Sequence, residues 1–152
     1  MALVSDAGTP GIADPGNKLV AAVYQRNKNQ KSKIKVVAVP GPAAVTAALS
    51  IAGLPVDRFI FLGFAPTKKG REKFFSQIAE SKIAVVFYES PYRIIKTLEK
   101  LREVLVAERL VVVCRELTKV FESIYRGNAA EVIAQITGDK IKGEFVVIVE
   151  AS

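Results

Sequence analysis

The segment from residue 6 to residue 16 has the composition that most favours a ligand site. Its eleven residues include three glycines and two prolines, which predicts a rigid loop whose backbone can approach a ligand closely. The loop follows a short apolar segment, residues 2–5, that is typical of the end of a buried strand, and open α/β sheets bind ligands at such ends. A plain strand-to-helix connection fits the spacing equally well. The spacing is neither a G-x-G-x-x-G fingerprint nor a P-loop, so phosphate binding is not predicted.

A second loop of small residues, Pro40-Gly41-Pro42-Ala43-Ala44, lies between a predicted strand and a predicted helix. Small side chains at the start of a helix would let an adenosine or methionine group lie against the backbone. Ordinary packing of a helix on a sheet also explains this loop, and it is the better explanation when the loop is considered alone.

Charged and hydroxyl side chains gather beside three more predicted strand ends. These strings are Glu89-Ser90-Pro91-Tyr92-Arg93, Arg115-Glu116-Leu117-Thr118-Lys119 and Lys142-Gly143-Glu144. Each string by itself fits a helix cap or a surface ion pair. Their common position at strand ends favours a functional cleft. Cys114 is interpreted as a buried core residue, because nothing in its neighbourhood indicates a reactive thiol.

The charged residues limit the chemistry that the chain can perform. Histidine is absent, which excludes a Ser-His-Asp triad, a Cys-His dyad and most zinc sites within this chain, and no metal site is predicted.

The net charge of +7 suits a nucleic acid partner, although a basic enzyme without a polyanionic partner would have the same charge. The densest basic cluster is Lys28, Lys31, Lys33 and Lys35. We expect it on a solvated loop, and RNA contact is its less favoured interpretation.

Three features predict a soluble cytoplasmic protein. A single cysteine fits a reducing compartment. The first residues lack the basic and apolar regions of a secretory signal, and no apolar run is long enough to cross a bilayer.

Two structural segments would position these motifs. Residues 1–53 predict a strand, a loop and a helix at about residues 17–26, then a strand at residues 34–39 and a helix at about residues 43–52. This pattern is a fragment of a parallel α/β layer that cannot cover both faces of its sheet. We therefore expect further strands on its N-terminal side. Residues 54–57 are the predicted linker.

Residues 58–152 predict a second α/β domain. Its strands are expected at residues 59–64, 83–88, 110–114, 121–126 and 145–149. Its helices are expected at residues 70–81, 92–105 and 129–136. The fourth strand alternates polar and apolar residues, which predicts that it is half-exposed and antiparallel to the third. The predicted fold class is therefore α/β, with an incomplete N-terminal domain followed by a mixed five-stranded sheet with helices.

Taken together and in order, the motifs resemble one family. The resemblance rests on Ser5-Asp6-Ala7-Gly8-Thr9-Pro10, Asp14-Pro15-Gly16, Pro40-Gly41-Pro42-Ala43-Ala44, Gly53-Leu54-Pro55-Val56-Asp57-Arg58-Phe59, Phe87-Tyr88-Glu89-Ser90-Pro91-Tyr92-Arg93, Arg115-Glu116-Leu117-Thr118-Lys119-Val120-Phe121-Glu122 and Lys142-Gly143-Glu144-Phe145. The chain is similar to the ribosomal RNA small-subunit methyltransferases that act on the ribose 2′-oxygen of a cytidine. These enzymes resemble the tetrapyrrole methylases in fold, with two α/β domains and S-adenosylmethionine in the cleft between them.

The resemblance implies a cofactor, partners and site residues. It implies S-adenosylmethionine as methyl donor, small-subunit ribosomal RNA as substrate, and a homodimer. The residues expected to bind the cofactor, in one cleft between residues 1–53 and 58–152, are Asp6, Gly8, Thr9, Pro10, Ile12, Pro42, Ala43, Ala44, Tyr88, Cys114, Arg115 and Gly143. Glu116 and Lys119 are the candidates for removing the proton of the ribose hydroxyl. Lys119, Arg115, Arg93 and Lys142 are expected to form a positive surface beside that cleft.

The chain departs from the family in one respect. The family has an N-terminal strand and a glycine-rich loop of the type Thr-Pro-Ile-Gly-Asn-Leu-x-Asp before the segment that begins here, and no such loop is present. We therefore expect an N-terminally truncated chain that by itself is a weak or inactive methyltransferase and associates with itself. Two other functions stay open: a tetrapyrrole methylase, and a non-catalytic module for dimerisation or RNA binding.

Overall fold

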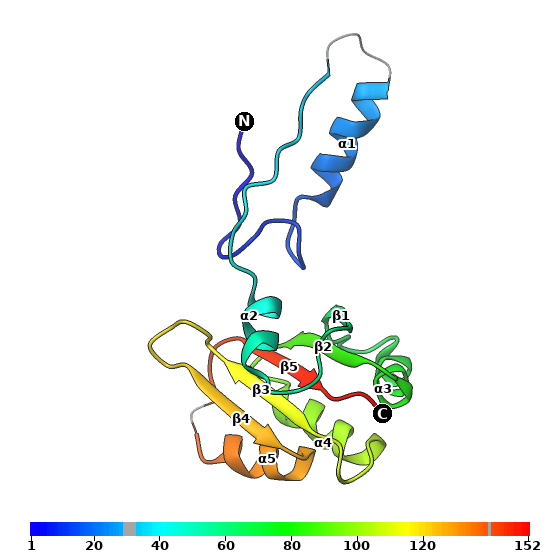
Figure 1. Ribbon diagram of the computed structural model, residues 1–152, viewed down its shortest axis with the longest axis vertical. Helices are drawn as coiled ribbons and strands as arrows, with labels where there is room; N and C mark the ends of the chain where they lie inside the picture. Colours follow the sequence, from blue (N-terminus) through cyan, green and yellow to red (C-terminus); the bar gives the residue numbers. More distant parts are fainter. Residues whose placement is uncertain (29–32, 140) are drawn as a thin grey trace. The chain divides into compact units, whose positions relative to one another are not determined.

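The computed structural model describes residues 1–28, 33–139 and 141–152. The chain divides into two compact units, Met1–Ala43 and Ala44–Ser152, which are described in turn (Figure 1). Among the described residues, no helix has both the length and the apolar composition needed to cross a membrane.

The first unit contains helix α1 (Asn17–Lys28), which confirms the helix predicted from residue 17. The strands predicted at residues 2–5 and 34–39 are wrong. Neither segment pairs with a strand among residues 1–28 and 33–43, and strand geometry is maintained by hydrogen bonds to a neighbouring strand. Val4 and Val39 are exposed as a result. Lys31, from the expected basic cluster, lies outside the described residues, whereas Lys28, Lys33 and Lys35 are exposed.

The second unit is a helix-covered, five-stranded mixed sheet, as predicted. Its elements are α2 (Ala44–Ile51), β1 (Phe59–Phe64), α3 (Arg71–Glu80), β2 (Ala84–Glu89), α4 (Ile94–Val104), β3 (Val111–Arg115), β4 (Ser123–Gly127), α5 (Ala129–Thr137) and β5 (Phe145–Val149). The strand order is β1-β2-β5-β3-β4. Only β1 and β2 are parallel; β5 is antiparallel to β2 and β3, and β4 is antiparallel to β3, which confirms that prediction.

The central strands are mostly apolar because both faces of the sheet are covered, and charged residues occur only where β2 ends at Glu89 and β3 ends at Arg115. On β3, Val111 and Val113 face a large core formed with α3, α4 and α5. Val112 and Cys114 face a smaller core on the side that α2 covers. Every residue of β3 and β5 is buried, so the alternation of a half-exposed strand does not occur in them.

Helix α2 packs on the sheet of the second unit. Its residues Val45, Ala48 and Leu49 are buried against Val112 and Ile148. The division into compact units accordingly falls at Ala43 and Ala44. The linker expected at residues 54–57 connects α2 to β1 within this unit. Its role as the boundary between complete domains stays a prediction.

Candidate functional site

Most of the predicted site residues of the second unit lie at the edge of the sheet where strands β1, β2 and β3 end. The carboxyl ends of β1, β2 and β3 lie there beside the amino ends of β4 and β5. Tyr88 of β2 and Cys114 of β3 both pair with Val146, on either side of β5. Arg115 pairs with Phe145, two residues after Gly143. The structure therefore brings Tyr88, Cys114, Arg115 and Gly143 to one edge.

A compact cluster, formed by Glu116, Lys119, Gly143 and Glu144 and called here the Glu116 cluster, extends beyond this edge. The Glu116 backbone N–H donates to the Glu144 carbonyl oxygen at 3.0 Å, and the Glu144 N–H donates to Oε1 of Glu116 at 2.8 Å. Lys119 Nζ lies 3.0 Å from Oε1 of Glu116 and 3.0 Å from Oε2 of Glu144. These contacts join the segment after β3 to the segment before β5.

Glycine is required at position 143 of this cluster. Its φ angle is +89°, in the region that side chains disfavour, and a Cβ atom there would overlap Cγ and Cδ of Glu116. The close approach of the two segments therefore depends on the missing side chain.

The backbone after β3 is held in an unfavourable conformation. Glu116 and Thr118 have positive φ angles of 49° and 66°. Each such non-glycine residue costs on the order of 1–3 kcal/mol. The turn is braced where the Thr118 N–H donates to Oε2 of Glu122 at 2.6 Å and the Lys119 N–H donates to the Glu116 carbonyl at 2.9 Å. Strain of this kind persists where surrounding contacts enforce it, and it is common at functional sites.

Both candidate catalytic side chains are charged at neutral pH. The hydrogen bond from the Glu144 N–H, followed by the one from Lys119, lowers the pKa of Glu116 below its ordinary value. Hydrogen bonds to Glu116 and then to Glu144 raise the pKa of Lys119. In this arrangement Lys119 is a proton donor and a cation, and Glu116 is the group able to accept a hydrogen bond from a hydroxyl.

The two residues before the cluster have their side chains in different surroundings. Cys114 is buried in the smaller core, and burial, followed by the charge of Glu122, raises the pKa of its thiol to about 11. Arg115 is also buried, and its Nε donates to the Lys142 carbonyl oxygen at 2.8 Å. Arg115 thus anchors the segment that carries Gly143.

The expected positive surface from Arg93, Arg115, Lys119 and Lys142 is largely wrong. Arg115 is buried, Arg93 is paired with Glu89, and Lys119 is paired with two carboxylates. Lys142 is exposed. The sequence placed these cations near the strand ends correctly, and the ion pairs with Glu89, Glu116 and Glu144 are the alternative that it left open for these strings.

A buried polar network lies at the end of β2, and the sequence revealed only part of it. Glu89, 1% exposed, accepts hydrogen bonds from Thr97 Oγ1 at 2.7 Å and from the Ser90 N–H at 2.7 Å. Arg93 forms an ion pair with the same carboxylate at 2.7 Å. Arg71 Nη2 donates to Thr97 Oγ1 at 2.9 Å. Thr97 could have been suspected from its position on the apolar face of α4, three residues after Ile94.

Arg71 and Arg93 also fix the segment that follows β1. Arg93 Nη1 donates to the Ala65 carbonyl oxygen at 3.1 Å, and Arg71 Nη1 donates to the Pro66 carbonyl oxygen at 3.0 Å. The buried carboxylate of Glu89 therefore determines, through these two arginines, how the chain leaves β1.

The first unit brings its own two predicted loops together. The Thr9 N–H donates to the Pro42 carbonyl oxygen at 3.0 Å, and Thr9 Oγ1 donates to the same atom at 3.2 Å. Gly8 lies beside that carbonyl.

The other predicted cofactor residues of the N-terminal segment differ in their exposure. Asp6, Ile12 and Pro42 are exposed, whereas Pro10 and Ala43 are half-buried. Ala44, the last member of the predicted set, begins α2 in the second unit. Whether all of these residues line one cleft with those of the sheet edge stays a prediction.

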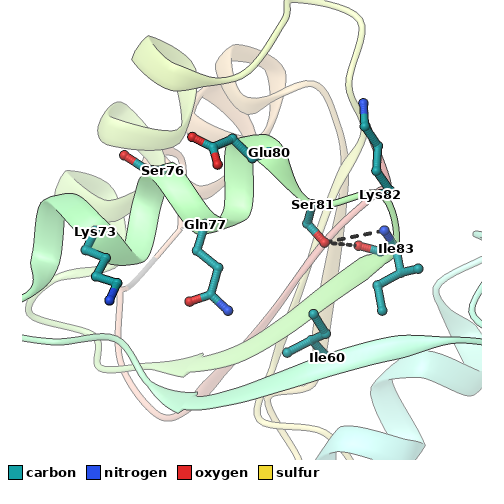
Figure 2. Close-up of a pocket in the computed structure, with 8 residues that line it drawn as sticks. All are labelled: Ile60, Lys73, Ser76, Gln77, Glu80, Ser81, Lys82 and Ile83. Carbon is teal, nitrogen blue, oxygen red and sulfur yellow. Dashed lines mark hydrogen bonds between the residues drawn. The ribbon is translucent and has the colours of Figure 1, made fainter.

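A cavity of about 460 Å³ lies away from this site. Figure 2 shows the side chains that line it. It is lined by Ile60 and Ile83, near the amino ends of β1 and β2, and by residues of α3 that include Lys73, Gln77 and Glu80. Ser81 Oγ donates to the Ile83 carbonyl oxygen at 2.7 Å at its rim. It therefore lies at the opposite end of these strands from the predicted site.

Comparisons with known proteins agree with this architecture. Residues 1–133 match the family model described as Tetrapyrrole (Corrin/Porphyrin) Methylases. The chain therefore belongs to the tetrapyrrole methylase family, which uses S-adenosylmethionine as methyl donor. This confirms the resemblance, the fold class and the cofactor expected from the sequence.

The chain is also similar to curated proteins with a more specific name. The chain is 43% identical over 150 residues to Ribosomal RNA small subunit methyltransferase I of Synechocystis sp., covering 98% of this chain and 52% of that protein. It is 48% identical to the protein of the same name from Vibrio cholerae, covering 98% of this chain and 51% of that protein. The chain thus spans about half the length of these relatives.

Two solved structures have the same fold. The methyltransferase CobJ aligns with a TM-score of 0.64 at 22% identity, covering 95% of this chain and 62% of CobJ. The cobalt precorrin-4 methyltransferase CbiF aligns with a TM-score of 0.68 at 16% identity, covering 94% of this chain and 61% of CbiF. At this identity the likeness supports the fold alone.

Proposed function

We propose that this chain forms part of an S-adenosylmethionine-dependent methyltransferase that methylates a cytidine 2′-oxygen in small-subunit ribosomal RNA. The Glu116 cluster is the observation that carries the proposal. It places a carboxylate and an ammonium group on a strained turn at the edge of the sheet that holds Tyr88, Arg115 and Gly143. The relatives with 43% and 48% identity have names that specify ribosomal RNA of the small subunit.

The exposed loops of the first unit fit the proposed cofactor. The loop at residues 6–16 and the segment ending at Pro42 are joined by hydrogen bonds and carry small residues beside exposed backbone. Such a surface admits an adenosine or a methionine group. We propose that Asp6, Gly8, Thr9, Pro10, Ile12, Pro42 and Ala43 hold the cofactor together with Ala44, Tyr88, Cys114, Arg115 and Gly143.

The residues of the second unit would align the reaction. The bound cofactor supplies an activated methyl group, so the protein chiefly contributes orientation and a partly dehydrated site. Glu116 would accept a hydrogen bond from the ribose hydroxyl, orient its oxygen and take up its proton as the methyl group is transferred. The Glu144 N–H and Lys119 hold the Glu116 carboxylate in place, and both lower its pKa and so keep it ionised.

Two further properties belong to this proposal. The family resemblance implies a homodimer, and exposed apolar residues such as Val4, Val37 and Val39 of the first unit favour association. The substrate implies a protein that acts in the cytoplasm, where ribosomal subunits are assembled. Both are expectations to be measured by light scattering and by cell fractionation.

Cofactor binding and methyl transfer are the first tests. Calorimetry of the 152-residue chain with S-adenosylmethionine should detect weak binding. Transfer of labelled methyl groups to small ribosomal subunits should be weak or absent for the wild-type chain. A longer chain that includes the family's N-terminal loop should restore transfer, and Glu116→Gln should lower it about 100-fold or more. Glu99→Gln, an exposed change on α4, is the matched control.

The outcomes separate the competing functions. Absence of cofactor binding in both chains would favour a non-catalytic dimerisation or RNA-binding module. Binding followed by methylation of a tetrapyrrole, but not of ribosomal subunits, would favour a tetrapyrrole methylase. The fold likeness to CobJ and CbiF is compatible with that alternative but carries no information on the substrate.

A further inference from the structure

The edge strand β1 contains a distortion that redirects an aromatic side chain. Phe61 pairs with Val86 and Phe64 pairs with Tyr88, so the register shifts between the two phenylalanines. Gly63 allows this shift with a φ angle of +66°. In a regular strand, residues three apart face opposite sides of the sheet. Here the rings of Phe61 and Phe64 both contact Tyr88, with centroid distances of 4.9 and 5.3 Å.

The redirected Phe64 is open to solvent although its neighbours are packed. Phe61 and Tyr88 pack against the smaller core, whereas Phe64 is 54% exposed. Tyr88 meets Phe64 edge-on and limits its movement. A large aromatic ring that is held on one side and exposed on the other is suited to stacking with a planar group.

A basic loop follows this ring directly. Thr67, Lys68, Lys69 and Gly70 are all exposed. Lys68 and Lys69 come four and five residues after Phe64, which places them within roughly 14–18 Å of it. Across the part of the chain that the structure describes, neither lysine belongs to an ion pair.

Hydrogen bonds attach the start of this loop to the core. Its first carbonyl groups, those of Ala65 and Pro66, accept hydrogen bonds from Arg93 and Arg71, which Glu89 and Thr97 hold in turn. The lysines are therefore presented from a base whose geometry is set inside the protein. Phe64 and the start of this loop lie at the same edge of the sheet as the Glu116 cluster.

We infer that Phe64, Lys68 and Lys69 bind a single-stranded segment of the substrate RNA, an inference that rests on the proposed function. Phe64 stacks against a base, and the two lysines contact phosphates. Aromatic rings combined with cations are the usual means of binding single strands, because every base has a flat face and every nucleotide a phosphate. The charge argues against a second copy of this chain as the occupant, since two basic loops would then be brought together.

Fluorescence anisotropy of a labelled, unstructured RNA octamer with the 152-residue chain tests this inference. Phe64→Leu keeps an apolar side chain but removes stacking, so affinity should fall about 5- to 150-fold. Phe64→Trp should retain binding. The double variant Lys68→Gln/Lys69→Gln should weaken binding and reduce the slope of log K against log salt by about 1.4, which corresponds to two phosphates.

A matched control tests whether position matters as well as charge. Lys73 and Lys82 are exposed and line the cavity at the other end of β1 and β2. Lys73→Gln/Lys82→Gln removes the same charge and should leave affinity within about twofold of the wild type. Equal losses in the two double variants would mean that binding depends on net charge alone, and the inference would be wrong.

Two more measurements keep this inference separate from the proposed function. Calorimetry with S-adenosylmethionine should give the same affinity for Lys68→Gln/Lys69→Gln as for the wild type, and absence of cofactor binding in both would count against the proposed function only. Absence of RNA binding by the wild-type chain would overturn the inference whatever the cofactor result. If Phe64→Leu changed the mass in light scattering but not the RNA affinity, this surface would be a contact between copies of the chain.

Discussion

Replacing Thr97 with valine should destabilise the second unit far more than the same change at an exposed threonine. Thr97 Oγ1 is fully buried, donates to Oε2 of Glu89 and accepts from Arg71. Valine keeps the shape of the side chain but makes neither hydrogen bond. The Glu89 carboxylate would then lose a 2.7 Å contact in a site that water does not reach.

The expected loss follows from these contacts. Hydrogen bonds to charged groups contribute about 1.5–3 kcal/mol each, and the half-buried Arg71 retains its bond to Pro66. We therefore expect the free energy of unfolding to fall by about 2–3 kcal/mol. With a urea m-value of about 2 kcal/mol per molar, the midpoint should move down by about 1 M. Urea titration followed by far-ultraviolet circular dichroism measures this shift.

The control for this prediction is Thr137→Val. Thr137 is exposed in α5, and among the described residues its Oγ1 bonds only to the Ile133 carbonyl oxygen of its own helix. The free energy of unfolding of Thr137→Val should stay within about 0.5 kcal/mol of the wild-type value. In a double-mutant cycle with Glu89→Gln, the coupling energy of Thr97→Val should be about 1 kcal/mol or more. Equal midpoints for the two threonine variants, or no coupling, would refute the reasoning about the buried carboxylate.

Three other changes test separate features. Gly143→Ala should cost about 1–3 kcal/mol in urea titration, since the new methyl group would displace Glu116 and strain a backbone with φ of +89°; Gly138→Ala, with φ of −75°, should cost less. Cys114 should react slowly with a thiol reagent at pH 8. Because its folded pKa is raised from 9.0 to about 11, the unfolded thiol ionises first, and stability should fall by up to about 3 kcal/mol as pH rises from 9 to 11; Cys114→Ala should lack this part of the pH dependence. Asn128→Ala removes the capping box of α5 and should lower the free energy of unfolding by about 1 kcal/mol.

The sequence predicted the sheet well because its strands are recognisable locally. Strands β1 and β5 occupy the predicted residues 59–64 and 145–149. Both are short runs rich in β-branched and aromatic residues, and polar or turn-forming residues lie close to their ends. The fourth strand was predicted to begin two residues too early and to end one residue too early, since the alternation at residues 121–126 includes Phe121, which is 70% exposed in the turn before β4.

The errors arose where structure depends on residues distant in sequence. The β-branched run at residues 34–39 has the composition of a strand, but within residues 1–28, 33–139 and 141–152 no strand pairs with it. Cations near the strand ends were found from their spacing, whereas the burial of Arg115 and the pairing of Lys119 with Glu144 depend on the meeting of two segments about 25 residues apart. The register shift near Gly63 could not be predicted from the sequence of β1 alone, because register is a property of two paired strands.

The position of β5 has a consequence for the order in which the chain acquires its structure. Residues 145–149 follow every other strand of the sheet in the chain, yet β5 lies between β2 and β3. As the chain is synthesised, β1–β2 and β3–β4 can each form a pair, but neither pair contacts the other until residue 149 is available. β5 joins the two strand pairs late, through contacts between residues that are far apart in the sequence, and such contacts slow folding. During synthesis the two half-sheets expose the edges that β5 will fill, so this interval is when the chain is most prone to pair with other strands.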